Sequence, residues 1–482
     1  MAVEFGPYDP LQSVTPQQIH EAALHLLDEV GFAGAPSSTV ALLTAKGGYL
    51  NDAGRLCLPP ALVEDVVART RRSWVLHGRG GRDDIEIAPG RVIVSTAGGA
   101  VLMLDLPQRE FRYPGVADAY RAARVIDACE HIHLATRPVV IRDIDKPSVA
   151  DLNLIYATAR GTTKPFSVSL TNVDHVEPML AMLDMIAGGE GAFVKRPFFW
   201  ASNAVTVSPL RIAADSAVIL EASVRRGVPY VAFSVPLAGT TGPASLTGTL
   251  VLAVAEALFV LAHIDAIRPG HPTAFGCMPF VSDLRTGATS GGGGEQALLM
   301  AGAAQMGRFY GVPYVGSAGM SDAKEPDVQT GFEKGHTITA LALAGANILS
   351  CYPGLLASLM AFNLEQLVID NEMIGNVLRT LQGFQGGDEA LSIDVIVEAV
   401  TGEGHFLGHP QTLQLMTSGF RYPELSDRGS THEWVGSGRP DIVEKAAAKV
   451  AELLARPVPD GITAEADRAI RARFDIHLPK TD

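Results

Sequence analysis

A polar run follows a buried apolar segment in the second half of the chain, and its residue types are ones that bind substrates or transfer protons. The segment Pro313–Gly316 is typical of a buried strand. The residues of interest then follow closely: Asp322, Lys324, Gln329, Glu333 and His336. The last three are spaced by four and three residues, which predicts one face of a helix. That face either points into a pocket or is polar and solvated.

Several of these residues also have structural explanations. Asp327 precedes Val328 and is suited to cap a helix, so capping and function are both open for it. Asp322 and Lys324 can pair and fix the loop, and a lysine in this position can alternatively form a Schiff base.

A second polar stretch, "MPFVSDLRTGATSGGGGE", places Asp283 and Arg285 just after another apolar segment. These two residues are expected to stabilise a loop or to line the mouth of a site. Glycine-rich loops can cradle phosphate through backbone N–H groups, or leave room for a bulky partner. Gly292 and Gly293 belong to this loop, and we favour the second explanation.

Composition and charge exclude several classes of protein. The chain has 482 residues, 47% hydrophobic and 19% charged, with a formal net charge of −14. This acidic balance argues against nucleic-acid binding. The four cysteines are far apart in the sequence. His405 and His409 have the spacing of a metal-binding pair on a helix, but the glycines and proline around them disfavour a helix, so no metal site is predicted. We see no signal peptide, so a cytoplasmic protein is expected. The apolar run 248–267 contains Glu256, His263 and Asp265, so we expect a buried barrel helix and not a membrane span.

The elements that must position these residues alternate between strands and helices. Short apolar runs and amphipathic segments repeat about eight times from residue 90 onward. Continuous apolar runs are typical of strands buried on both faces. The pattern predicts a closed (β/α)₈ TIM barrel, with a doubly wound open sheet as the alternative. No GxGxxG follows the first strand, which disfavours dinucleotide binding.

Three regions are predicted. Residues 1–90 form an N-terminal helical and small β region, with a Thr15-x-x-Gln18 capping box. Residues 91–357 form the barrel, and residues 358–482 form a C-terminal helical extension. In a barrel the loops after the strands build the active face, so the run after Pro313–Gly316 belongs to that face.

The order of short motifs from about residue 19 to 455 resembles the trimethylamine–corrinoid methyltransferase family, most closely its non-pyrrolysine, glycine betaine methyltransferase-like branch. The matching stretches are "IHEAALHLLDEVGF", "STAGGAVLMLDL", "VSPLRI", "MPFVSDLRTGATSGGGGEQALLMAGAAQMGRFYGVPYVGSAGMSDAKEPDVQTGFEK", "LALAGANILS" and "GHFLGHPQTLQLM". The resemblance implies a barrel, a methylated amine substrate, and a methyl-accepting corrinoid carried by a separate protein. The chain contains no pyrrolysine, which points toward quaternary amines, and no DxHxxG corrinoid-binding motif. Family members tend to self-associate, so a homo-oligomer is expected.

A quaternary amine needs aromatic faces, because it has no N–H to donate. Rings near the predicted strand ends are candidates, each with core packing as the alternative: Trp200, Phe233, Phe275, Phe280, Tyr314, Tyr352 and Phe362. Asn203, Arg285, Lys324 and His336 are candidate donors to a substrate carboxylate. The predicted substrate-binding set is therefore Asn203, Phe233, Phe275, Tyr314, Asp322, Lys324, Gln329, Glu333, His336 and Tyr352.

The expected reaction transfers a methyl group from a small betaine-type amine to the Co(I) of a corrinoid protein. It requires no general acid or base, so no catalytic residue is predicted. Asp283, Arg285, Gly292 and Gly293 are expected to face the corrinoid protein. The alternatives are an amine-binding protein without methyl transfer and a metal-dependent barrel hydrolase or lyase.

Overall fold

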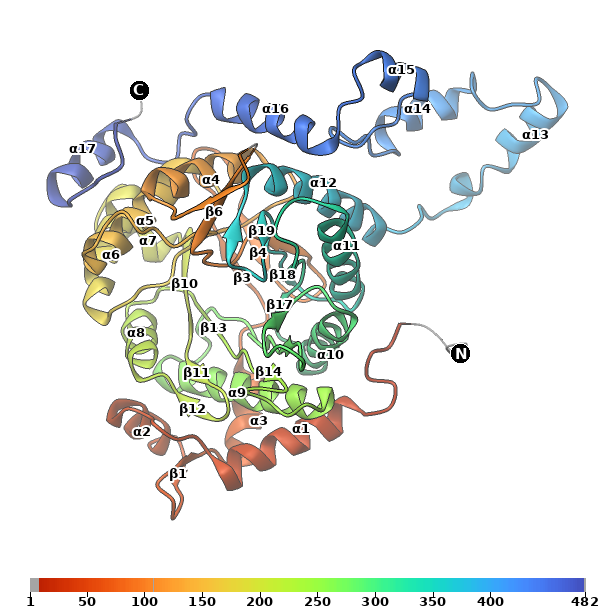
Figure 1. The fold of residues 1–482 in the computed structure, drawn as a ribbon. Helices are drawn as coiled ribbons and strands as arrows, with labels where there is room; N and C mark the ends of the chain where they lie inside the picture. The colour runs from red at the N-terminus through yellow and green to blue at the C-terminus, as the bar shows by residue number, and fades with distance from the viewer. Residues whose placement is uncertain (1–7, 107, 481–482) are drawn as a thin grey trace.

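The computed structural model describes residues 8–106 and 108–480 and contains eight parallel strand segments in a closed ring (Figure 1). In ring order they are β5 (Ile93–Ser95), β8 (Ala135–Thr136), β9 (Phe166–Ser167), β10 (Phe199–Ala204), β13 (Tyr230–Phe233), the segment 275–277, β17 (Val315–Ser317) and β18 (Ile348–Ser350). Regular parallel pairs join most neighbours. Parallel bridges Ser95–Leu134, Ser234–Cys277 and Phe275–Tyr314 complete the ring. The predicted barrel is confirmed, and closure excludes the open sheet.

Helices form an outer ring around the strands. They are α4 (Val116–Ala128), α5 (Pro147–Gly161), α6 (Val176–Ala187), α8 (Ala214–Arg225), α9 (Leu246–Ile267), α10 (Gly294–Tyr310), α11 (Val328–Leu343) and α12 (Leu364–Leu381). Each contacts the next, and α12 contacts α4, so this ring also closes. The eighth barrel helix therefore lies beyond residue 357, where we expected the C-terminal extension to begin.

The apolar helix α9 is long enough to span a membrane, but 83% of its most apolar window is buried inside the structure. It is covered by α1 (Pro16–His25), α2 (Ser37–Thr44) and α3 (Pro60–Arg69) from the N-terminal region. The expected capping box at Thr15 is present at the start of α1. The apolar run is thus a core helix of the barrel, as predicted.

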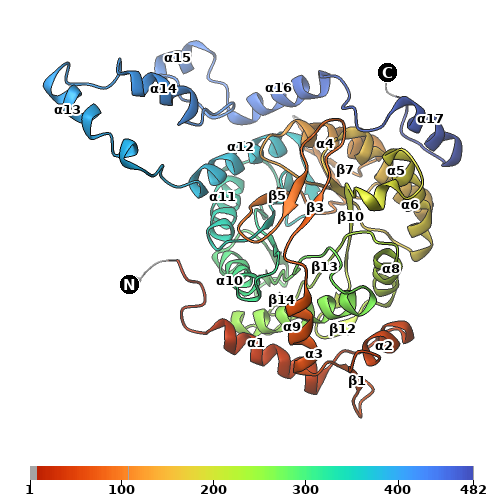
Figure 2. The same cartoon turned by 180° about the vertical axis from the view of Figure 1, so that it is seen from behind.

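A hairpin of β3 (Trp74–Leu76) and β4 (Ile85–Ile87) covers one end of the barrel (Figure 2). His77 N donates to Pro197 O (2.8 Å), and Trp74 Nε1 donates to Thr273 O (2.9 Å). Pro197 and Thr273 each stand just before a barrel strand. The hairpin therefore closes the end at which the strands begin.

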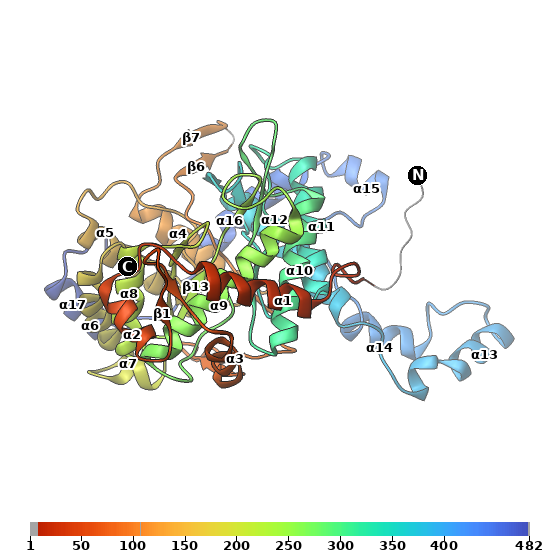
Figure 3. The same cartoon turned by 90° about the horizontal axis from the view of Figure 1, so that it is seen from below.

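The opposite end carries hairpins that follow the strands. One sheet has the order β19 (Leu355–Leu356), β20 (Ala361–Phe362), β6 (Leu102–Asp105), β7 (Glu110–Arg112). A second rim hairpin consists of β15 (Phe280–Ser282) and β16 (Thr289–Ser290), with β14 (Leu237–Ala238) beside β15. In Figure 3, β6 and β7 lie at the opposite end of the molecule from α3.

The remaining elements lie outside the barrel strands and the ring of helices. Hairpins β1 (Tyr49–Leu50) with β2 (Leu56–Cys57) and β11 (Thr206–Val207) with β12 (Arg211–Ile212), and the short α7 (Ala192–Lys195), join the larger elements. The C-terminal extension holds α13 (Ile393–Thr401), α14 (Pro410–Ser418), α15 (Thr431–Gly436), α16 (Ile442–Ala455) and α17 (Ala464–Arg473). Helix α16 packs on α12 and α4, whereas α13 and α14 project as an arm (Figures 1 and 3).

Candidate functional site

A cavity of about 500 Å³ lies inside the barrel, and the β3–β4 hairpin contributes Trp74 and Leu76 to its lining. Every second residue of several strands lines it, as the alternation of side chains along a strand requires. Examples are Leu134 and Thr136; Trp200, Ser202 and Ala204; Val231, Phe233 and Val235; Met278 and Phe280; and Ile348, Ser350 and Tyr352. The cavity is therefore built by the inward-facing side chains of the barrel wall.

Five aromatic side chains contribute to the cavity lining: Trp74, Trp200, Phe233, Phe280 and Tyr352. Trp74 comes from the closing hairpin and was not among the predicted residues. Burial raises the pKa of Tyr352 to about 12, so its phenol stays protonated at neutral pH. These rings form a surface suited to an organic cation or to an apolar group.

Tyr352 is held in an unusual backbone conformation by a buried ion pair. Its φ is +47°, in the left-handed region that non-glycine residues rarely adopt. Lys334 Nζ donates to Tyr352 O (3.0 Å) and to Asp370 Oδ2 (2.8 Å), and the same carboxylate oxygen accepts from Gly354 N (2.7 Å). Helices α11 and α12 thus fix the loop that brings this ring to the cavity.

Among the described residues, Arg137 is the one charged side chain in the cavity lining. It follows β8 directly, and burial lowers the pKa of its guanidinium, partly offset by Asp151. Its buried Nε has no hydrogen-bond partner in the part of the chain that the structure describes. The sequence analysis missed Arg137, although its place just after a predicted strand was visible in "HIHLATRPVVI".

Three residues of the predicted substrate-binding set line the cavity: Asn203, Phe233 and Tyr352. Asn203 Oδ1 accepts from Tyr230 Oη (3.1 Å), and its Nδ2 donates to Leu170 O (3.2 Å). The amide is therefore oriented by the barrel wall itself.

Phe275 and Tyr314 lie on the other side of the wall. Both are buried, with ring centroids 6.2 Å apart, and Tyr310 packs edge-on against Phe275 at 5.3 Å. Tyr314 Oη donates to Cys277 O (3.0 Å). The residue after Tyr314, Val315, is the one that lines the cavity.

Two carboxylates of the polar run tie rim loops together. Glu333 accepts from Ser321 Oγ (2.6 Å), Asp322 N (2.8 Å) and Gln329 Nε2 (2.8 Å). Asp322 accepts from Ser290 Oγ (3.0 Å), Gly291 N (3.1 Å) and Ser358 Oγ (2.7 Å). These bonds join the loops that follow strand segment 275–277, β17 and β18.

The other members of the run face elsewhere. His336 and Lys324 are exposed; His336 Nδ1 hydrogen-bonds Phe332 O (2.8 Å), and Lys324 bonds the carbonyl of Asp322. Asp327 caps α11 by accepting from Thr330 N (2.9 Å), which confirms the capping explanation.

The predicted partner-facing residues divide into two groups. Asp283 and the exposed Arg285 pair with each other in the β15–β16 turn (2.6 Å), and this pairing lowers the pKa of Asp283 to about 2. Gly292 is buried, and a Cβ there would lie 2.3 Å from Glu333 Cδ, so the glycine permits a close approach of two loops. Gly293 is the N-cap of α10.

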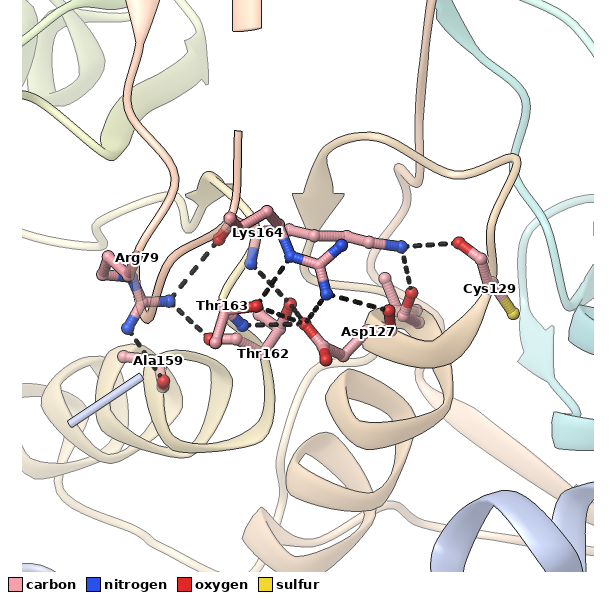
Figure 4. Close-up of polar contacts among 9 residues, drawn as sticks. Arg79, Asp127, Cys129, Ala159, Thr162, Thr163 and Lys164 are labelled. Atoms are coloured by element: carbon pink, nitrogen blue, oxygen red, sulfur yellow. Dashed lines mark hydrogen bonds and ion pairs between the residues drawn. The ribbon is translucent and has the colours of Figure 1, made fainter. Parts of the chain in front are cut away.

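A second cluster of buried cations lies near the closed end of the barrel (Figure 4). Lys164 Nζ donates to Ile126 O and Cys129 O (both 2.6 Å), and Arg79 donates to Thr162 O (2.6 Å) and Ala159 O (3.0 Å). Burial lowers the pKa of Lys164 to about 8. Both cations bond backbone carbonyls, so this cluster joins the ends of α4 and α5 to the start of β9 and to the β3–β4 hairpin, and it is structural.

Among residues 8–106 and 108–480, no group of three or more His, Cys, Asp or Glu side chains is placed to hold a metal ion. His409 caps α14 and pairs with Glu398 (3.1 Å), and His405 pairs with Glu403 (3.6 Å).

The fold is thus a closed (β/α)₈ barrel with an internal cavity lined in part by aromatic rings. Residues 1–476 match the family model described as "Trimethylamine methyltransferase (MTTB)". The chain is 28% identical over 465 residues to the glycine betaine methyltransferase of Desulfitobacterium hafniense (strain Y51), covering 96% of each chain. It is 27% identical to the trimethylamine methyltransferase MttB of D. hafniense (strain DSM 10664 / DCB-2), covering 92% of this chain and 90% of that one.

A solved structure described as "Crystal structure of the hydroxylamine MtmB complex" aligns with a TM-score of 0.48 and 14% identity, covering 91% of this chain and 87% of that chain. By the match to its model, the chain belongs to the trimethylamine methyltransferase family, and it is a methyltransferase.

Proposed function

We propose that the protein transfers a methyl group from a small quaternary amine of the betaine type to the Co(I) of a corrinoid carried by a separate protein. The observation that carries this proposal is the cavity lining, in which residues 8–106 and 108–480 place five aromatic rings and neither a carboxylate nor an imidazole. Aromatic faces attract quaternary ammonium groups by about 0.5–2 kcal/mol per ring. The names of the relatives support a methylated amine as the substrate class.

The lining suits a reaction without proton transfer. Methyl transfer breaks the C–N bond and leaves its electron pair on nitrogen, so a quaternary ammonium departs as a neutral tertiary amine. A reduced corrinoid supplies the Co(I) nucleophile that accepts the methyl group. The protein holds the cation against the rings, excludes water with apolar walls and points one methyl carbon toward the rim.

The rim after the strands is the proposed docking face for the corrinoid protein. Leu284 and Arg285 are exposed in the β15–β16 turn. The bonds made by Asp322 and Glu333 hold the neighbouring loops in fixed positions. In this proposal these two carboxylates shape the mouth, while Asn203, Phe233 and Tyr352 contact the substrate. We further propose a cytoplasmic homo-oligomer.

The test is methyl transfer with free cob(I)alamin or a purified corrinoid protein as acceptor, followed by the absorption change of the corrinoid on methylation. We expect methylation with at least one betaine, and none with the protein omitted. Tight binding of a betaine without methylation would favour the amine-binding alternative. Activity on another substrate that is lost on chelation would favour the metal-dependent hydrolase or lyase.

A further inference from the structure

Arg137 faces the cavity, and no residue of the described ranges 8–106 and 108–480 forms a salt bridge with it. No side chain in these ranges forms a hydrogen bond with its guanidinium, and its Nε is buried. Asp151 is engaged elsewhere, accepting from Thr171 N (2.8 Å) and contacting His175 Nδ1 (2.7 Å). A Cβ at Gly99 would lie 3.5 Å from Arg137 Nη1, so the Gly98–Gly99 turn rests against the guanidinium.

A guanidinium that is partly buried and has no partner is unfavourable, and it changes which ligands fit the cavity. A simple organic cation, such as a tetraalkylammonium, would place a second positive charge in the same cavity. A ligand with both an ammonium and a carboxylate would instead supply the missing counter-ion. Arginine is suited to this role because its planar fork binds carboxylate in a bidentate manner.

The topology places the two halves of such a ligand on opposite walls. Arg137 follows β8, and Phe280 follows the strand segment 275–277, which is the fourth strand from β8 in either direction around the ring. Phe233, on β13, is next to that segment. A zwitterion can therefore extend across the barrel from the guanidinium to the rings.

We propose that Arg137 binds the carboxylate of the substrate and restricts the enzyme to quaternary amines that carry one. This inference rests on the proposed function, because it assigns the specificity of the same cavity. It also predicts the orientation of the ligand: the carboxylate lies at the β8 wall, and the trimethylammonium lies among Phe233, Phe280 and their neighbours.

The test compares two matched pairs of ligands by calorimetry on the full chain. The pairs are glycine betaine with glycine betaine amide, and γ-butyrobetaine with its amide, so that chain length varies while the cationic group is constant. In the wild-type protein at least one acid should bind about 10- to 100-fold more tightly than its amide, the range for a hydrogen bond to a charged group. Arg137→Met should bring the ratio of acid affinity to amide affinity to about one. Arg137→Lys should give a ratio between those of the wild-type protein and Arg137→Met.

Two controls distinguish a loss of carboxylate recognition from a loss of folding. Arg226→Gln removes an exposed cation that pairs with Glu177 on the outside of the barrel, and should leave the ratio unchanged. Arg137→Met should retain the wild-type melting temperature or exceed it, because it removes an uncompensated, partly buried charge. Equal binding of acid and amide by the wild-type protein, with methyl transfer intact, would overturn the role of Arg137 alone. If neither member of either pair binds and no methyl transfer occurs, the proposed function also fails.

Discussion

Trp200 and Phe199 are adjacent on β10, but they lie on opposite sides of the barrel wall. Trp200 lines the cavity, whereas Phe199 packs edge-on against Phe166, with ring centroids 5.3 Å apart. Trp200→Leu should weaken betaine binding about 2- to 30-fold, the loss of one cation–π contact. Phe199→Leu should lower the free energy of unfolding by about 1 kcal/mol or more without changing affinity. Calorimetry and thermal melting measure the two effects, and equal affinity of wild type and Trp200→Leu would remove that ring from the site.

His133 makes the stability of the barrel depend on pH. Its Nδ1 accepts from Val94 N (3.0 Å), so the neutral imidazole is the form that fits. Burial and the nearby Lys164 lower its pKa to about 4, from an unfolded value of about 6.5. The contribution is complete above about pH 6.5 and is lost as the pH falls toward 4, by up to about 3 kcal/mol.

His133→Gln isolates this effect, because the amide oxygen can still accept from Val94 N but does not titrate in this range. The free energy of unfolding of each protein is measured with denaturant at pH 7, 6, 5 and 4. As the pH falls, the wild-type protein should lose more of this free energy than the variant does. A constant difference across the series would contradict the assignment.

At the scale of elements, the order of strands and helices was predictable because it rests on long apolar runs separated by amphipathic segments. Which residues face the cavity was less predictable. Tyr314 and Val315 differ by one position, and one position moves a side chain to the other face of a strand. The run "PYVGSAG" is apolar on both faces, so its pattern does not show which face is inside.

The polar run after β17 illustrates a second limit. Its residue types are those of a binding site, yet Glu333 and Asp322 bond the loops around them. Those bonds join residues 290–291 and 358 to the run, and a sequence does not show such pairings between distant loops. Arg137 was not predicted from the sequence, because a single arginine in an apolar stretch has the pattern of a surface residue, and only the closed barrel shows that it faces the cavity.

The loop between β18 and β19 depends on the buried pair of Lys334 and Asp370, both of whose side chains are almost fully buried. Asp370→Asn keeps the shape but leaves Lys334 without its counter-charge, and should lower the free energy of unfolding by about 3–5 kcal/mol. Because the pair also fixes Tyr352 O, affinity for a betaine should fall as well. Thermal melting and calorimetry check both results. A folded variant with unchanged affinity would show that the ring is held in place without the ion pair.

At the scale of the whole molecule, the two ends of the barrel have different tasks. The N-terminal hairpin and the cation cluster of Arg79 and Lys164 close one end with bonds to backbone carbonyls. The other end carries the hairpins and carboxylate-linked loops of the rim. In the proposed function, a partner bringing a corrinoid would approach from the rim, and the C-terminal arm of α13 and α14 lies apart from that end of the barrel (Figure 3).

The arm exposes a contiguous apolar face, and such faces often mark a surface that another molecule covers. In α13 the exposed residues Ile393, Ile396, Val397 and Val400 follow the i, i+3, i+4, i+7 spacing of one helix face. We expect a second copy of the chain to cover this face in the proposed homo-oligomer. The double variant Ile396→Asp and Val400→Asp should then shift the mass measured by light scattering after size exclusion to that of one chain.

The barrel should be little affected by that change, since the arm projects away from it, and its melting temperature should remain close to that of the monomeric wild-type protein at high dilution. Asp394→Asn alters the same helix outside the apolar set and should leave the mass unchanged. A wild-type protein that runs as a single chain at micromolar concentration would contradict the prediction directly. So would an oligomer that survives the double variant, because its contacts must then lie on another surface, such as the outer ring of barrel helices.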